Sequence, residues 1–257
     1  MTAMTTRTRG AGRDARGATG LAAALTCAVL VSGCSYDPTK EVVPIPPGVP
    51  PGAGAPVPTV DLSAPGRTSA QLSAWAEPIA DSTRIPRIAL EAYGNAAETM
   101  RQTRPDCHLT WTTLAGIGRV ETRHGNFRRS SLEDDGVARP PIVGVKLDGS
   151  PGFAEVPDTD GGALDGDAEH DRAVGPMQFI PESWRKYGRD ANGDGVADPN
   201  QIDDASVAAA RLLCDAGGDL GTAEGWRDAV MAYNASTKYL NDVRDAAAAY
   251  SVGTSAP

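Results

Sequence analysis

The sequence predicts a mainly α-helical domain, interrupted by one long acidic loop that carries a small β-hairpin. Apolar residues recur at helical spacing in several segments, and capping residues stand at their starts. Between Gly125 and Gly175 this spacing is absent, and two short runs rich in β-branched and aromatic residues flank a turn. A loop of this length in a compact domain is usually functional or loosely ordered.

Five helical segments and one hairpin follow in order along the chain. Pro86 opens the first helix, and Thr110 is expected to cap a second that runs to about Thr122. The hairpin is expected to comprise Ile142–Leu147, the turn Asp148-Gly149 and Phe153–Val156. Three more helices follow: Asp204 as cap of Ala205–Ala216 with Gly217 as its stop, Thr222 as cap of Ala223–Tyr233, and Ser236 as cap of a last amphipathic helix.

The N-terminus has the pattern of an export signal. Four arginines precede a short apolar stretch, Leu21–Val31, which is much shorter than the ~20 residues that a transmembrane helix needs. The stretch ends in Val31-Ser32-Gly33-Cys34, which resembles a bacterial lipobox; in that class the cysteine becomes the lipidated first residue. An ordinary signal peptide that contains a cysteine is the alternative.

Composition then divides the chain into four parts. Residues 1–33 are the expected lipoprotein signal peptide, and residues 34–68 are rich in Pro, Gly and Ala, which predicts a lipid-anchored spacer without a core of its own. Residues 69–252 are long enough for one well-buried domain, and residues 253–257 form a tail. The expected location is the outer face of the cell membrane.

Charge and cysteines limit the class of protein. The formal net charge is −9, and it becomes more negative without the arginine-rich leader, so we expect no nucleic-acid partner. Two of the four cysteines lie outside the leader and the lipobox, Cys107 and Cys214. Since export places them in an oxidising compartment, a disulfide between them is expected; two separate buried thiols are the alternative.

Glu121 is the first candidate for catalysis. In the helix from Thr110 it continues a face formed by Leu114, Ile117 and Gly118, so its carboxylate is expected to point inward, with room left beside it by Gly118. Burial raises the pKa of a carboxyl group, as a general acid at neutral pH requires. A salt bridge with Arg119 or Arg123 is the competing interpretation. His124 and His170 are assigned no role, since no nucleophile pairs with them.

Three segments extend this interpretation. They are Glu121-Thr122-Arg123-His124-Gly125, the run Gly175-Pro176-Met177-Gln178-Phe179-Ile180-Pro181, and Tyr233-Asn234-Ala235-Ser236 followed by Tyr239. In this order and spacing they resemble the membrane-bound lytic murein transglycosylase B family, over about Ile85 to Tyr250, and the Ala, Arg and Gly content resembles its actinobacterial members. The resemblance implies a lysozyme-like fold and non-hydrolytic cleavage of the β-1,4 bond between N-acetylmuramic acid and N-acetylglucosamine, which gives a 1,6-anhydromuramyl end.

The resemblance also implies roles for residues. Glu121 matches the catalytic acid and base, and Gln178, Tyr233, Asn234 and Tyr239 match residues that bind the glycan or orient the carboxylate. For Gln178 the alternative is an amide bonded to its own loop, and for the tyrosines it is a place in the core. No catalytic cofactor is implied. Glycan strands are the expected substrate, and the membrane is the expected partner of the lipid anchor.

The long loop departs from the best-known members of the family. It is acidic, and Asp158, Asp160, Asp165 and Asp167 cluster in it. It is interpreted as a wall of the cleft, as a cation site, as solvated surface, or as the source of a second carboxylate that would favour hydrolysis. Two other functions therefore stay open: a hydrolytic glycosidase of the lysozyme or chitinase type, and an inactive wall-binding lipoprotein.

A second motif predicts a structural calcium site. Asp190, Asn192, Asp194 and the Val196 carbonyl stand at positions 1, 3, 5 and 7 of an EF-hand loop, with Gly195 at position 6. Position 12 is Gln201, so Asp198, Asp203 or Asp204 would have to close the site, and the resemblance favours Asp204. A turn rich in Asx and Gly residues without an ion is the alternative.

Overall fold

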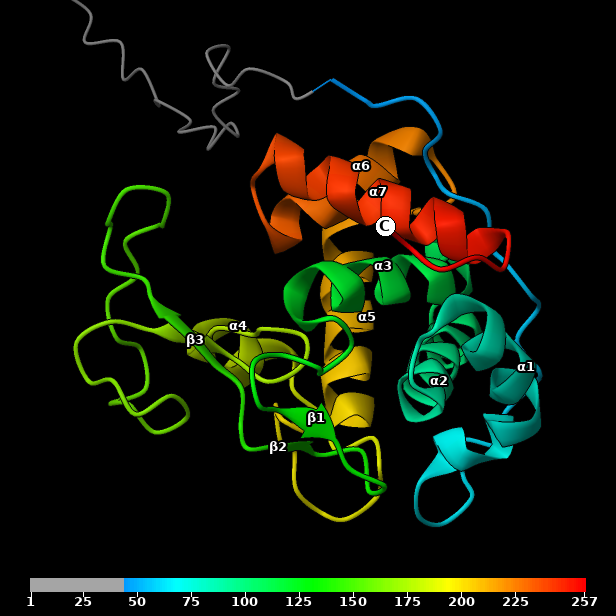
Figure 1. The fold of residues 1–257 in the computed structure, drawn as a ribbon, viewed down its shortest axis with the longest axis horizontal. Coiled ribbons are helices and arrows are strands. Elements are labelled where there is room, and N and C mark those ends of the chain that lie inside the picture. Colours follow the sequence, from blue (N-terminus) through cyan, green and yellow to red (C-terminus); the bar gives the residue numbers. More distant parts are fainter. Residues whose placement is uncertain (1–43) are drawn as a thin grey trace, which may run out of the picture. The chain divides into compact units, whose positions relative to one another are not determined.

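The structure is a computed structural model, and it describes residues 44–257, which form one compact unit. The expected signal peptide and the lipobox cysteine, Cys34, lie outside the described residues. The unit is mainly helical, with two small antiparallel sheets, which confirms the predicted class (Figure 1). The helices are η1 (Thr68–Leu72), α1 (Ser73–Thr83), α2 (Arg87–Thr103), η2 (Pro105–Cys107), α3 (Trp111–Thr122), α4 (Pro181–Tyr187), α5 (Ile202–Gly217), α6 (Ala223–Tyr233) and α7 (Thr237–Ser251).

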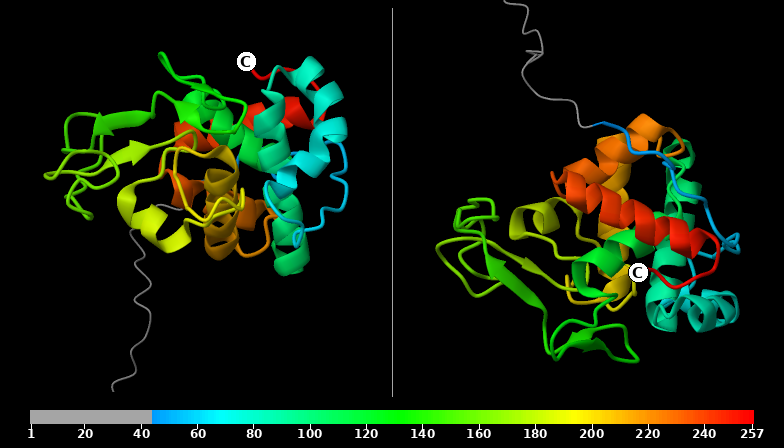
Figure 2. Two further views of the ribbon diagram at one scale, coloured as in Figure 1. Left: turned by 90° about the horizontal axis from the view of Figure 1, so that it is seen from below. Right: turned by 45° about the horizontal axis from the view of Figure 1, so that its top comes forward.

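Helix α3 lies at the centre of the helical part. Every residue from Trp111 to Gly118 is buried, so this part of the helix is covered on all sides rather than on one stripe. It packs on α7 and α2, α2 packs on α5, and α5 packs on α6 (Figures 1 and 2). Gly116 permits the close approach of α7, because a Cβ there would lie 2.7 Å from the Val243 carbonyl oxygen. The buried part of α3 therefore fixes the position of its C-terminal end.

The predicted helix starts are mostly confirmed. Thr222 and Ser236 each accept a hydrogen bond from a backbone N–H in the first turn of α6 and α7. Thr110 precedes α3 as expected, although its hydroxyl contacts Thr112 and Thr113 instead of a backbone N–H. The predicted start of α5 is wrong: Gln201 is the cap, and its side-chain oxygen accepts from the N–H groups of Asp203 and Asp204.

The predicted hairpin is only partly correct. Strand β3 (Val143–Lys146) pairs with β4 (Arg172–Val174), not with Phe153–Val156. The chain does turn back after Leu147, where Val156 donates to the Leu147 carbonyl and Asp148 bridges to Glu155. The second sheet consists of β1 (Ser131–Leu132) and β2 (Ala138–Arg139). As a result, residues 143–174 form an arm that projects from the helices and ends just before the Gly175–Pro181 motif (Figure 1).

The described part of the expected spacer differs from an extended tether. Residues 51–60 lie along the helices, and Val60 is fully buried. Trp111 donates its indole N–H to the Ala55 carbonyl at 3.0 Å, and the Thr112 hydroxyl donates to the Gly52 carbonyl at 2.9 Å. The prolines of this segment lack a backbone N–H donor, but the carbonyls of the segment accept side-chain hydrogen bonds. The folded unit therefore begins before residue 69.

The predicted disulfide is confirmed. Cys107 in η2 and Cys214 in α5 are bonded, with their Cα atoms 5.5 Å apart. The bridge connects η2, which immediately precedes α3, to α5.

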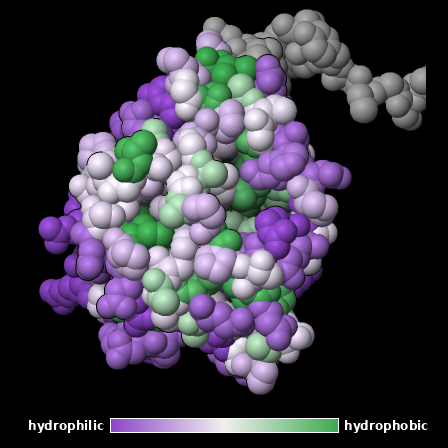
Figure 3. Space-filling model, turned by 90° about the vertical axis from the view of Figure 1, so that its right-hand side faces the viewer, coloured by the Kyte–Doolittle hydropathy of each residue, from purple (hydrophilic) through white to green (hydrophobic). Residues whose placement is uncertain are grey.

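The surface is mixed. On the face that Figure 3 shows, hydrophobic groups appear as separate patches among hydrophilic residues. Within residues 44–257, no helix combines the length and the apolar character that crossing a bilayer requires.

Candidate active site

Glu121 lies in the last turn of α3, where the helix emerges from the core. After Thr122, three consecutive residues have left-handed backbone angles: Arg123, His124 and Gly125, with φ values of 54°, 61° and 83°. A left-handed backbone conformation costs a non-glycine residue about 1–2 kcal/mol relative to the right-handed one. The turn is held by hydrogen bonds from the N–H groups of Arg123 and His124 to the Arg119 and Gly118 carbonyls.

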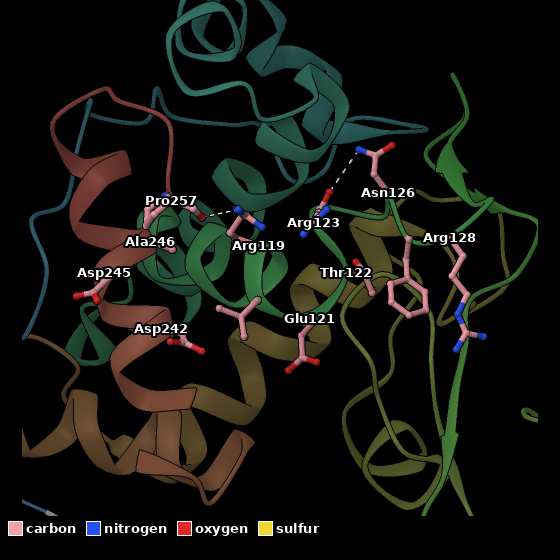
Figure 4. Close-up of a pocket in the computed structure, with 12 residues that line it drawn as sticks. Arg119, Glu121, Thr122, Arg123, Asn126, Arg128, Asp242, Asp245, Ala246 and Pro257 are labelled. Carbon is pink, nitrogen blue, oxygen red and sulfur yellow. Dashed lines mark hydrogen bonds between the residues drawn. The ribbon is translucent and has the colours of Figure 1, made fainter. Parts of the chain in front are cut away.

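A pocket of about 660 Å³ opens beside Glu121 (Figure 4). Its walls come from the end of α3, the segment that follows it, and α7. The lining residues are Arg119, Val120, Glu121, Thr122, Arg123, Asn126, Phe127, Arg128, Asp242, Asp245, Ala246 and Pro257. Arginines dominate the α3 side and aspartates the α7 side, so a bound ligand meets opposite charges on the two walls.

Tyr239 holds the Glu121 carboxylate. Its hydroxyl donates to Oε1 of Glu121 at 2.5 Å, whereas Oε2 has no hydrogen-bond partner in the described part of the chain. Burial raises the pKa of Glu121 to about 7, and the hydrogen bond from Tyr239 acts in the opposite direction. At neutral pH this group can therefore both donate and accept a proton.

The other two residues of the last motif are placed differently. Tyr233, at the end of α6, is stacked on Tyr239 with ring centroids 6.5 Å apart, and its hydroxyl donates to the Met177 carbonyl at 2.7 Å. It therefore links the Gly175–Pro181 loop to the site, and burial together with the nearby Glu121 charge raises the pKa of its hydroxyl. Asn234 is exposed and caps the end of α6 through its backbone.

Gln178 is bonded to its own loop. Its amide donates to the Gly175 carbonyl at 2.9 Å, and it does not line the pocket beside Glu121. This is the alternative that the sequence left open for this residue. Gly175 makes the loop possible, because it has a φ of 75° and a Cβ would lie 1.8 Å from the Pro199 carbonyl oxygen.

The space beside Gly118 is used differently from the expectation. A Cβ at this position would lie 2.1 Å from the Tyr93 hydroxyl and 3.3 Å from Nδ1 of His124. Gly118 therefore makes room for Tyr93 and His124, not for the Glu121 carboxylate.

The acidic loop does not supply a carboxylate to the Glu121 pocket. Asp158, Asp160, Asp165 and Asp167 accept hydrogen bonds from backbone N–H groups of the arm itself. Asp167 also pairs with Arg172 and Lys146. These charges shape the arm. The other carboxylates of the pocket are Asp242 and Asp245 of α7, which the sequence did not single out and which pair with Lys238 and Arg244.

The expected calcium loop folds around Asp204. This carboxylate is fully buried and accepts from the N–H groups of Ala191 at 2.7 Å and Asp198 at 2.9 Å. Asp190 accepts from Gly193 and Gly195, and Asp194 accepts from Val196. Burial raises the pKa of Asp204 to about 7. In residues 44–257, no Lys or Arg pairs with Asp190, Asp194 or Asp204, so the buried carboxyl group lacks a cationic partner.

The fold and the site define a class of protein: a helical domain with one partly buried carboxylate, poised for proton transfer in an open pocket. The family model for the transglycosylase SLT domain matches residues 171–232. The matched segment contains the Gly175–Pro181 loop and the expected calcium loop, and it ends one residue before Tyr233. No curated protein matches the chain in sequence.

Two solved structures are similar at low identity. The lytic transglycosylase Slt35 of Escherichia coli in complex with bulgecin A is 16% identical, with coverage of 70% of this chain and 78% of that chain and a TM-score of 0.36. The same Escherichia coli protein in complex with calcium is 15% identical, with coverage of 74% and 80% and a TM-score of 0.40. Both similarities are weak.

Proposed function

We propose that this protein is a peptidoglycan lytic transglycosylase that cleaves the β-1,4 bond between N-acetylmuramic acid and N-acetylglucosamine without water. The observation that carries the proposal is Glu121: its pKa is raised to about 7 by burial, one carboxylate oxygen is held by Tyr239, and the group lies in an open pocket. The match of residues 171–232 to the transglycosylase SLT domain supports the same activity.

The chemistry needs one carboxyl group in two protonation states. Protonated Glu121 donates its proton to the glycosidic oxygen as the bond to the muramyl C1 breaks, and the bonding electrons leave with that oxygen. The carboxylate then takes the proton of the muramyl C6 hydroxyl, whose oxygen forms the new bond to C1. The substrate's acetamido oxygen stabilises the positive charge between the steps, so no second protein carboxylate is required, unlike in most glycosidases. Because Tyr239 binds Oε1, Oε2 is the oxygen that faces the substrate.

Product analysis tests this proposal directly. Mass spectrometry of muropeptides released from purified sacculi should show 1,6-anhydromuramyl ends with no water added. Reducing ends would instead indicate a hydrolase, and then Asp242→Asn should also abolish cleavage, because Asp242 lies in the same pocket. Binding without any release would indicate an inactive wall-binding protein.

The rate of cleavage should fall as the pH rises through about 7. The first step needs the protonated carboxyl group, and the pKa of Glu121 is about 7, so the active form is present below this pH and is lost above it. Tyr239→Phe removes a hydrogen bond that lowers this pKa, so the alkaline limb of the profile should move to higher pH. A limb that stays in place in the Tyr239→Phe protein would contradict the role given to Tyr239.

We propose that Asp190, Asn192, Asp194, Asp204 and the Val196 carbonyl hold a structural calcium ion. The supporting observation is the buried Asp204 carboxylate at the centre of an acidic loop without a protein counter-charge. A buried charge is costly unless it is paired, and Ca²⁺ prefers oxygen ligands of this kind. The ion would close the loop between α4 and α5 and take no part in the chemistry.

Calcium should therefore raise the melting temperature. A ligand that binds only the folded state at 100 times its Kd stabilises it by about 2.7 kcal/mol. Protein stripped of metal should melt at a lower temperature in chelator than in calcium, and Asp190→Ala should remove the difference. Asp134→Ala, which changes an exposed carboxylate outside the loop, should retain it. Equal melting temperatures of the wild type in calcium and in chelator would exclude the site.

We propose that Cys34 carries a lipid that holds the protein at the outer face of the cell membrane. The lipobox pattern Val31-Ser32-Gly33-Cys34 after the apolar stretch supports this. Cys34→Ala should move the protein from the membrane fraction to the soluble fraction, and continued sedimentation with membranes would contradict the lipid anchor.

A further inference from the structure

The turn that follows Glu121 is strained, and one of its strained residues is buried. Arg123 and His124 both have left-handed backbone angles, yet His124 is only 4% exposed. A strained conformation persists only where the surrounding structure fixes it, and such positions cluster at functional sites. The contacts that fix this turn are therefore part of what aims the Glu121 side chain.

His124 makes two buried hydrogen bonds to different helices. Its Nε2 lies 2.9 Å from the hydroxyl of Tyr250 on α7, and its Nδ1 lies 3.2 Å from the hydroxyl of Tyr93 on α2. Burial lowers the pKa of His124 to about 3, so the ring is neutral, with one nitrogen donating and the other accepting. A neutral imidazole is well suited to join two hydroxyls on opposite sides in this way.

Thr122 fixes the same turn from the other side. Its hydroxyl donates to the Pro176 carbonyl at 2.6 Å and accepts from the Gly125 N–H at 2.8 Å. The turn is thus joined to α2, to α7 and to the Gly175–Pro181 loop.

We infer that His124 is a positioning residue for Glu121, which fixes the end of α3 against the helix that carries Tyr239. Tyr250 and Tyr239 both belong to α7. One end of that helix therefore holds the backbone after Glu121 through His124, while the other end holds the carboxylate through Tyr239. Loss of the His124 contact lets the turn relax, and the carboxylate then loses its alignment with Tyr239 and with the substrate. The inference rests on the proposed function for the reaction that it affects.

The test compares substitutions that keep one partner each. His124→Gln can reach the position of Nε2 and keep the contact with Tyr250, whereas His124→Asn reaches only the position of Nδ1 and keeps the contact with Tyr93. Tyr250→Phe removes a single hydroxyl and keeps the ring, so it covers the case in which the His124 variants fail to fold. The matched control is Thr113→Val at the other end of α3, which removes the buried hydrogen bond between the Thr113 hydroxyl and Trp226.

Cleavage of a soluble glycan of defined length is measured well below each melting temperature. We expect kcat to fall about tenfold or more in His124→Asn and Tyr250→Phe, with KM within a factor of about two, since a misplacement of about 1 Å can cost ~10²-fold in rate. His124→Gln should keep most of kcat, and Thr113→Val should lower the melting temperature with kcat unchanged. Equal kcat in Tyr250→Phe and the wild type, or an equal loss of kcat in Thr113→Val, would overturn the inference.

A second readout does not depend on activity. The pKa of the Glu121 carboxyl group, followed by ¹³C NMR, should rise above the wild-type value in Tyr250→Phe, because the carboxylate loses the hydrogen bond from Tyr239 that lowers this pKa, and it should stay near the wild-type value in Thr113→Val. If wild-type protein cleaves no glycan but this shift is seen, the proposed function fails while the positioning role stands. An unchanged Glu121 pKa in Tyr250→Phe would overturn the positioning role even in an active enzyme.

Discussion

Glu121→Gln should abolish the release of muropeptides while binding to sacculi survives. The amide keeps the size of the side chain and can still accept the hydrogen bond from Tyr239, but it cannot cycle a proton. General acid–base catalysis is worth about 10²–10⁴-fold for each role, and here one residue holds two roles in succession. Release from sacculi and retention on them, measured in parallel, separate catalysis from binding.

The matched control for this change is Glu224→Gln, which alters an exposed glutamate in the first turn of α6 and should leave release unchanged. Full release by the Glu121→Gln protein would exclude both transglycosylase and hydrolase chemistry at this carboxylate. Asp242 would then become the candidate acid, because its carboxylate lies in the same pocket.

Removal of the disulfide should produce the largest loss of stability. The bridge closes a loop with a sequence separation of 107 residues. For a loop of about 100 residues, the chain-entropy model gives a stabilisation of about 4.7 kcal/mol. Replacement of Cys107 and Cys214 by serine should therefore lower the free energy of unfolding by several kcal/mol, as measured by denaturant titration.

The single variants provide the control for this measurement. Cys107→Ser and Cys214→Ser should each approach the stability of the double variant, since either change opens the same loop. Unfolding free energies that match the oxidised wild type would show that the bridge adds nothing to stability. Two free thiols in the exported wild-type protein would show that it does not form.

The helices could be predicted because their information is local. The apolar spacing of α2 and α7 and the capping hydroxyls of Thr222 and Ser236 are properties of single segments. The start of α5 was misplaced because Asp204 and Gln201 are both polar and lie three residues apart. Only the fold shows that Asp204 turns back to the 190–198 loop, which leaves Gln201 to cap the helix.

The site could be predicted in part for the same reason. Glu121 was identifiable from one helical face and from the motif that surrounds it, but its partner Tyr239 is 118 residues away, so only the fold brings the two together. The role of His124 depends on Tyr93 and Tyr250, which belong to two other helices. Pairing of β3 with β4 was missed because the turn at Asp148-Gly149 predicts a local hairpin, whereas the actual partner follows the whole acidic arm.

The burial of α3 from Trp111 to Gly118 affects how this protein should lose activity. The amide hydrogens between Ala115 and Gly118 lie in the middle of a helix that is covered on every side, so exchange with solvent deuterium requires the whole core to open. Glu121 lies about one helical turn after this protected segment. Because His124 and Tyr239 bond the end of α3 to α7, we expect the proposed catalytic activity and the cooperative unfolding transition to disappear at the same urea concentration.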